Sequence, residues 1–190
     1  VPSQIVSLTT DQTSGFTGAQ VASMTNVQLD AIETADLANL STAQIASITS
    51  VQVVNLTTQQ IQALTTTQAG ALTSVQVPSL SVSQLQSIET QDLAQMSTSA
   101  VKSFSANQAK NLTTGQVAAL TTAQIAAVET AKFAELTTAQ IVALTTQQMA
   151  GLTTAQLANM TSAQVAALET RDLVNLSTTQ LQALTTAQMS

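Results

Sequence analysis

The chain has 190 residues, of which only 7% are charged, and its formal net charge is −6. It contains no Cys, His, Trp or Tyr, so thiolate nucleophiles, imidazole acid–base chemistry, disulfides and the usual zinc ligands are absent. We therefore expect no enzyme, no cofactor, no metal centre and no small-molecule substrate. Four Lys and Arg residues cannot neutralise a polyphosphate, so no nucleic-acid partner is expected, and no apolar run reaches the roughly 18 residues of a membrane span.

Two apolar positions recur every eight residues along the chain. One series runs from Leu8 to Leu184, and the other runs from Ile5 to Met189 with a single lapse at Thr13. We call the first series position one of an octad, so that the second series is position six. This self-similarity predicts one uninterrupted repeat array over residues 1–190 rather than a domain with a single core. Both ends fall inside an octad, which predicts a segment of a longer array.

Positions two and five of the octad carry a helix-start signal. Position two is Ser or Thr in 19 of 23 octads, and position five is Gln in 19 of 24. A Ser or Thr followed three residues later by Gln forms a capping box, in which each side chain bonds to the other residue's backbone N–H. Helices that restart every eight residues must be short. The expected fold is therefore an all-α solenoid with one very short helix per octad, and positions one and six line a narrow core.

Two other folds were considered. A continuous helix would rotate its apolar stripe by about 80° per octad, which is more than a supercoil absorbs. An uninterrupted strand would send positions one and six to opposite faces, because their separation is odd. A β-solenoid with a turn inside each octad avoids that difficulty and stays open as the alternative.

In four octads the two cap positions change together. These pairs are Glu33 with Asp36, Glu89 with Asp92, Glu129 with Lys132, and Glu169 with Asp172. The joint change indicates contact, and the Glu129 and Lys132 charges attract at this spacing. The three Glu/Asp pairs are candidates for a hard cation such as Ca²⁺, with solvated or capping acids as the alternative. The Glu octads recur after 56, 40 and 40 residues, which indicates duplication of a five-octad block.

Several residues bear on helix ends and on the core. Pro78 falls in position seven, where a regular helix needs the N–H, so its octad should form a single turn or a 3₁₀ helix. Position eight is mostly Ala, Ser, Asn or Gly, residues that suit close packing or a left-handed helix end. Its asparagines create N-x-S/T sequons whose glycosylation stays open, namely Asn39, Asn55, Asn111, Asn159 and Asn175. The expected large core fillers are Phe16, Phe104, Phe133, Met24, Met96, Met149 and Met160.

Runs such as Leu-Thr-Thr-Ala-Gln-Ile-Ala-Ala at residues 120–127 are present throughout the chain. They resemble the octapeptide-repeat regions of very large secreted bacterial surface proteins that are labelled adhesin-like or haemagglutinin-like. The resemblance covers all 190 residues and implies an extracellular, cell-surface and fibrous setting. It carries over no catalytic or binding residue.

The expected function is structural. We expect a self-associating segment of an extracellular filament or cell-surface stalk, with head-to-tail stacking of repeats and lateral pairing left open. The alternative is a solenoid binding module for carbohydrate, protein or ice. A binding face should appear as clustered departures at positions four and seven, and along the sequence no such cluster is visible. Ice binding depends on the β-solenoid, because capping uses the Thr hydroxyls.

Overall fold

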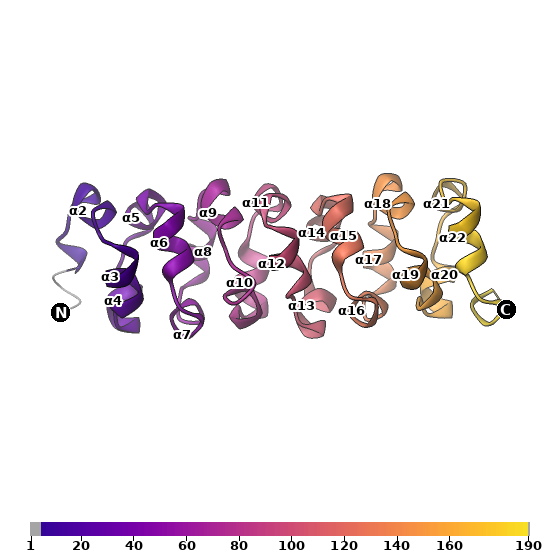
Figure 1. Ribbon diagram of the computed structural model, residues 1–190, viewed down its shortest axis with the longest axis horizontal. Helices are drawn as coiled ribbons and strands as arrows, with labels where there is room; N and C mark the ends of the chain where they lie inside the picture. The colour runs from indigo at the N-terminus through magenta and orange to yellow at the C-terminus, as the bar shows by residue number, and fades with distance from the viewer. Residues whose placement is uncertain (1–4, 190) are drawn as a thin grey trace. The chain divides into compact units, whose positions relative to one another are not determined.

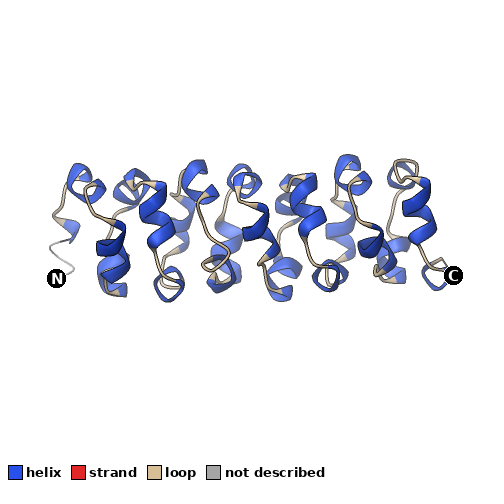
Figure 2. Ribbon diagram, in the orientation of Figure 1, coloured by secondary structure: helices blue, strands red, loops and turns tan. Residues whose placement is uncertain are grey.

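The computed structural model describes residues 5–189, so the chain ends at Val1 and Ser190 lie outside the described residues. Between 5 and 189 the structure contains helices and no strand (Figure 2). This confirms the all-α solenoid and makes the β-solenoid alternative wrong. The chain divides into two compact units, Val1–Ser103 and Phe104–Ser190. In each unit the short helices follow one another as a coil (Figure 1).

The helices of the first unit are α2 Thr10–Ser14, α3 Gly18–Ser23, α4 Asn26–Asp30, α5 Thr34–Asn39, α6 Thr42–Ser47, α7 Ser50–Val53, α8 Thr58–Gln62, α9 Thr66–Gly70, η1 Val77–Ser79, α10 Val82–Ser87, α11 Thr90–Gln95 and α12 Thr98–Lys102. Those of the second unit are α13 Ala106–Asn111, α14 Thr114–Ala119, α15 Thr122–Ala127, α16 Thr130–Ala134, α17 Thr138–Val142, α18 Thr146–Ala150, α19 Thr154–Ala158, α20 Ser162–Ala166, α21 Thr170–Leu173, α22 Thr178–Ala183 and η2 Thr186–Gln188.

Each helix starts as the octad pattern predicts. At the start of α17, Thr137 Oγ1 accepts a hydrogen bond from the Gln140 backbone N–H at 3.2 Å. The Gln140 Oε1 atom in return accepts from the Thr137 N–H at 2.8 Å. The same reciprocal pair begins most of the other helices in both units. The capping box therefore satisfies two of the backbone donors that a helix start leaves without an intrahelical acceptor.

The helix ends differ from the prediction in one respect. No described residue has a positive φ, so the expected left-handed ending at position eight is wrong. The N–H of position one instead bonds to the carbonyl of position six, as Leu144 does to Ile141 at 3.2 Å. Position one then adopts an extended conformation in many octads, as at Leu40 (φ −64, ψ 142). An extended residue redirects the chain into the next cap without a left-handed turn.

The octad that contains Pro78 forms the 3₁₀ helix η1 rather than an α-helix, which confirms the prediction for this proline. Proline supplies no N–H at position seven. A 3₁₀ turn is closed here by a bond from the Leu80 N–H to the Val77 carbonyl at 3.1 Å. The interruption is confined to one octad, because α10 starts normally at Val82.

Positions one and six form the buried core of each unit, as predicted. Ile45 and Ile141 are fully buried, and Leu144 is 2% exposed. Of the larger fillers, Phe104, Phe133, Met96, Met149 and Met160 are buried, while Phe16 and Met24 are only half-buried. The lapse at Thr13 is tolerated because this buried hydroxyl donates to the Thr10 carbonyl at 2.8 Å.

Helices three octads apart lie in contact within a unit. In the first unit α3 packs on α6 and α9 on α11, and in the second unit α13 packs on α16 and α19 on α22. Side-chain hydrogen bonds join residues 28 to 31 positions apart, as described below. One turn of the solenoid therefore takes between three and four octads, a number that the sequence left undecided.

Candidate functional site

The most regular polar feature of both units is a ladder of glutamine side chains at position five. The Gln76 Nε2 atom donates to the Ile48 carbonyl at 2.6 Å and to the Ile45 carbonyl at 2.8 Å. In the second unit, Gln148 Nε2 donates to Leu120 at 2.5 Å and to Val117 at 2.8 Å. The residues of this glutamine ladder are Gln44, Gln52, Gln60, Gln68, Gln76 and Gln84, and Gln140, Gln148, Gln156, Gln164, Gln180 and Gln188.

Each glutamine of the ladder does two things at once. Its Oε1 atom caps its own helix, and its Nε2 atom supplies two donors to carbonyls of the preceding turn. All ladder glutamines are buried, and a buried amide is stable only when its donors and acceptors are satisfied. The ladder therefore holds successive turns in one register along the apolar core.

The sequence analysis identified the capping role of these glutamines and missed their contact with the preceding turn. A signal was present in the choice of Gln over Glu. A Glu at this place would also complete the capping box, and it would interact better with the positive end of the helix dipole. Only Gln adds two N–H donors, so its recurrence indicates that acceptors lie close by.

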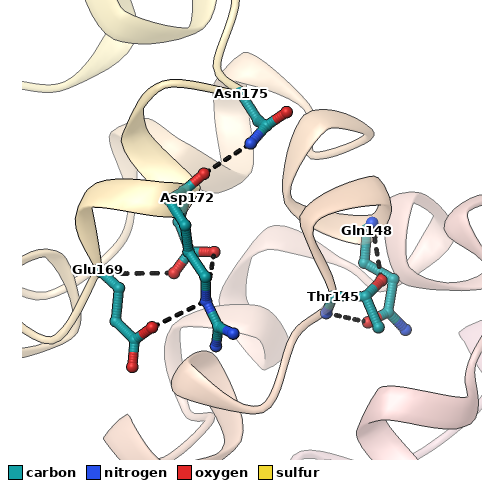
Figure 3. A network of polar contacts seen from close by, with 6 residues as sticks. Thr145, Gln148, Glu169, Asp172 and Asn175 are labelled. Atoms are coloured by element: carbon teal, nitrogen blue, oxygen red, sulfur yellow. Dashed lines mark hydrogen bonds and ion pairs between the residues drawn. The ribbon is translucent and has the colours of Figure 1, made fainter.

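The Glu/Asp pairs do not form paired carboxylates. In each pair the Asp side chain is buried and the Glu is exposed. Figure 3 shows the Glu169 and Asp172 variant beside the regular box of Thr145 and Gln148. Asp172 Oδ2 accepts from the Glu169 N–H at 3.2 Å, so the aspartate takes the acceptor role of the glutamine. The Glu129–Lys132 ion pair is present at 3.1 Å, as predicted.

An aspartate at position five cannot supply the two N–H donors. Asp36 Oδ1 accepts from the Thr10 hydroxyl at 2.7 Å. The Oδ1 atoms of Asp92 and Asp172, which are 4% and 0% exposed, have no hydrogen-bond partner among the described residues. Within residues 5–189 no three acidic or other metal-ligating side chains gather into one group. The proposed cation sites therefore reduce to single buried carboxylates, and cation binding stays a prediction.

The sequon asparagines share a structural role. Each Nδ2 atom donates to the carbonyl four residues earlier, at 2.6–2.9 Å: Asn39 to Ala35, Asn55 to Val51, Asn111 to Asn107, Asn159 to Ala155 and Asn175 to Arg171 (Figure 3 for Asn175). Ser at position eight acts similarly, as Ser47 does on the Gln44 carbonyl at 2.7 Å. Position eight therefore satisfies helix-end carbonyls with side chains.

The first unit carries an exposed line of valines at position four. Val27, Val51 and Val75 are 62%, 69% and 69% exposed. They are the chain's only valines at this position and are spaced by 24 residues, or three octads. The segments that carry them are neighbours: α7 contacts η1, and a surface hollow of about 250 Å³ is lined by Asn26, Val27 and Asp30 of α4 together with Asn55. We call these three residues the valine column.

Position seven of the same three octads also departs from the usual residues, with Asp30, Val54 and Pro78. The expectation that positions four and seven show no cluster is therefore wrong for the first unit. The departures lie 24 residues apart in the sequence, and only the three-octad stacking brings them onto one side of the coil.

The described helices are all too short and too polar to span a membrane. A family comparison matches four segments of the chain, residues 29–66, 85–122, 125–162 and 165–190, to the ALTTAQ repeat. The chain belongs to the ALTTAQ repeat family. No curated protein matches it. Every matched ALTTAQ segment begins four residues before the Glu of a Glu octad. The Glu octad is thus a fixed part of the longer repeat, in agreement with the predicted five-octad block.

Proposed function

We propose that this ALTTAQ repeat array is a structural segment of an extracellular filament or cell-surface stalk that associates with its own copies by stacking turn on turn. The observation that carries the proposal is the glutamine ladder. Its polar groups and the apolar core are both used to join one turn to the next, and this joining is repeated with the same atoms along each unit. Such an interface suits another turn of the same kind better than it suits a different ligand.

The first turn offers one half of this interface. Gln12, Gln20 and Gln28 occupy position five and cap their own helices. Their Nε2 atoms make no hydrogen bond among the described residues, and their side chains are exposed or half-exposed. They have the same donors that ladder glutamines aim at a preceding turn.

The last turn of the second unit offers the other half. An apolar hollow of about 370 Å³ is lined by Val165, Leu173, Leu181, Leu184 and Met189 among others. Leu181 and Met189 are exposed. In the ladder register, a following turn would donate to the carbonyls of Val165, Leu168, Leu173, Leu176, Leu181 and Leu184. The first turn of a second copy fits this requirement in both apolar surface and hydrogen bonds, which favours head-to-tail stacking.

Electron microscopy of the purified chain tests the proposal, with threads of uniform width as the expected result. Leu181→Asp should shorten or abolish the threads, because it places a charge in the apolar hollow. Ala139→Asp, which adds the same charge at an exposed residue of α17, is the matched control and should leave them intact. Monomers at every concentration, or equal behaviour of the two variants, would contradict head-to-tail stacking.

The extracellular location is part of this proposal. It is supported by the resemblance of the octads to repeat regions of large secreted bacterial surface proteins. The low charge of the surface, with 7% charged residues, also suits self-association because copies repel one another weakly. Secretion of a tagged full-length parent protein into the medium or onto the cell surface is the result expected, and retention in the cytoplasm would contradict it.

A binding module is the second candidate, and the valine column is the observation that favours it. Clustered departures at positions four and seven were the feature by which a binding face was to be recognised. The form of this candidate that binds ice depended on a β-solenoid, which the all-helical fold does not provide. A protein surface is the better match for an exposed apolar line.

A further inference from the structure

Single exposed apolar residues are common on proteins and need no explanation, whereas a contiguous exposed apolar line marks a contact surface. The valine column is such a line. Its three members are the only valines at position four, and all three fall at the same spacing as the turns that stack on one another. Val54, which follows Val51 on the same side of α7's octad, is a further exposed valine at 48%.

The geometry of the column indicates what covers it. Val27 and Val75 lie 24 residues on either side of Val51, so the column is symmetric about its middle. A two-fold contact between identical chains requires a surface that is complementary to itself in this way. A second copy also has the same distance between turns, so that three valines of one copy can meet three of the other.

We infer that the valine column is a lateral contact between two copies of this chain, paired antiparallel about a two-fold axis at Val51. This inference rests on the self-association part of the proposed function and names the surface for side-by-side pairing. In the pair Val51 meets Val51 of the second copy, and Val27 meets Val75.

The charges favour the antiparallel direction. Asp30 flanks Val27, while Pro78 flanks Val75, at position seven of their octads. A parallel pair in register would place Asp30 against Asp30, and like charges in contact are unfavourable. The antiparallel pair places Asp30 against the octad of Pro78, which carries no charge.

The contact is expected to be weak. The exposed valines of one copy cover less than the roughly 800 Å² per partner of a standard stable interface. Sedimentation equilibrium from about 10 µM to about 1 mM should therefore show concentration-dependent dimers. To exclude head-to-tail stacking, the measurement uses the Leu181→Asp chain as its background.

Replacing all three column valines by Gln in that background should shift the dissociation constant at least tenfold. The fold accepts Gln at position four, since Gln59, Gln91 and Gln147 occupy it elsewhere. Val174→Gln is the matched control, because Val174 is 74% exposed and lies outside the column. It should leave the dissociation constant unchanged. A monomer at all concentrations before the substitution, or equal effects of column and control, overturns the inference.

Disulfide crosslinking tests the direction of pairing, and the absence of native cysteine makes single-cysteine variants unambiguous. Under mild oxidation Val51→Cys should crosslink to itself. Val27→Cys and Val75→Cys should crosslink when mixed and react much more slowly alone, because a disulfide needs Cα atoms within about 7 Å. Rapid crosslinking of Val27→Cys with itself overturns the antiparallel pair. Threads that persist in the triple Gln variant of the otherwise unchanged chain, and are lost in Leu181→Asp, separate this lateral contact from head-to-tail stacking.

Discussion

Gln140 and Leu112 lie 28 residues apart in the sequence, and the Gln140 side-chain amide donates to the Leu112 carbonyl at 2.7 Å. The same amide nitrogen donates to Ala109 at 3.0 Å, while the amide oxygen caps the start of α17. One side chain thus joins local helix formation to the stacking of turns. A residue with only one of these functions should support the solenoid less well.

Replacement of Gln140 by Glu separates the two functions. The variant keeps an oxygen for the Thr137 N–H but loses both donors to the preceding turn, and it places a carboxylate beside two carbonyls. We expect a loss of about 1–3 kcal/mol, which is typical when buried acceptors lose their donor. Thr137→Ala, which removes only the cap bond, should cost about 1 kcal/mol.

Hydrogen exchange is the suitable measurement for this pair, because repeat arrays open locally and depart from two-state unfolding. In Gln140→Glu the amides of α13 and α14, on the preceding turn, should lose protection together with those of α17. In Thr137→Ala the loss should be confined mainly to α17. If Thr137→Ala proves as damaging to the preceding turn as Gln140→Glu, the glutamine ladder has no role in stacking.

The buried leucine that follows α17 gives a prediction about the core. Leu144 is 2% exposed, and Leu144→Asp places an unpaired charge in the apolar line between turns. We expect a loss of several kcal/mol, roughly the penalty for burying an uncompensated charge, and therefore a larger effect than that of Thr137→Ala. Thermal unfolding followed by circular dichroism compares this variant with Ala139→Asp, which carries the same charge at the surface. Equal, small effects would show that position one does not form the core.

A close approach between turns makes one glycine specific. A Cβ atom at Gly151 would overlap Thr122 Cγ2, whereas a Cβ at Gly15 would meet nothing closer than the Gln12 carbonyl at 3.4 Å. We expect Gly151→Ala to destabilise the second unit by about 1–3 kcal/mol, the usual cost of overpacking. Gly15→Ala should be neutral or slightly stabilising, because alanine favours the helical conformation found there.

A second substitution tests the cause of the Gly151 effect. Thr122→Ser removes the Cγ2 methyl group that the new Cβ would meet, so Gly151→Ala combined with Thr122→Ser should recover most of the lost stability. Residues in contact show such coupling, whereas distant residues add independently. Additive losses in the double variant would mean that the close approach of Gly151 and Thr122 is not what selects glycine.

The parts of the fold that depend on contacts within eight residues could be predicted from the sequence. The Thr137–Gln140 cap, the core role of Leu144 and the 3₁₀ turn at Pro78 are all of this kind. The parts that depend on contacts between turns could not, because the octad alone does not set the number of octads per turn. The donor role of Gln140 and the assembly of Val27 with Val51 both depend on that number.

The left-handed helix end was wrong for a local reason. Position-eight residues such as Asn39 were interpreted by their tolerance of positive φ, but their side chains instead donate to the last carbonyls. Side-chain and backbone solutions satisfy the same carbonyls. The sequence does not distinguish them, since Asn and Ser serve both.

Asp92 marks a place where the glutamine ladder is interrupted, and restoring it gives the last prediction. Asp92 Oδ1 is buried without a partner in the described part of the chain, and in the ladder register its side chain corresponds to a donor for Leu64 and Ile61. Asp92→Gln should therefore stabilise the first unit by about 1 kcal/mol or more, because it removes an unpaired buried acceptor and supplies two donors.

Asp36→Gln is the matched control for this substitution. It makes the same chemical change in the same octad position, but Asp36 already accepts from the Thr10 hydroxyl at 2.7 Å, and that bond is lost on replacement. Its gain should be smaller than that of Asp92→Gln or should vanish. Urea unfolding and the exchange rates of amides in α8 and α11 measure both effects. If Asp92→Gln lowers the stability while Asp36→Gln leaves it unchanged, the Asp92 carboxylate has a favourable partner, such as a bound cation. Addition of Ca²⁺ should then stabilise the natural chain and have no effect on the Asp92→Gln variant.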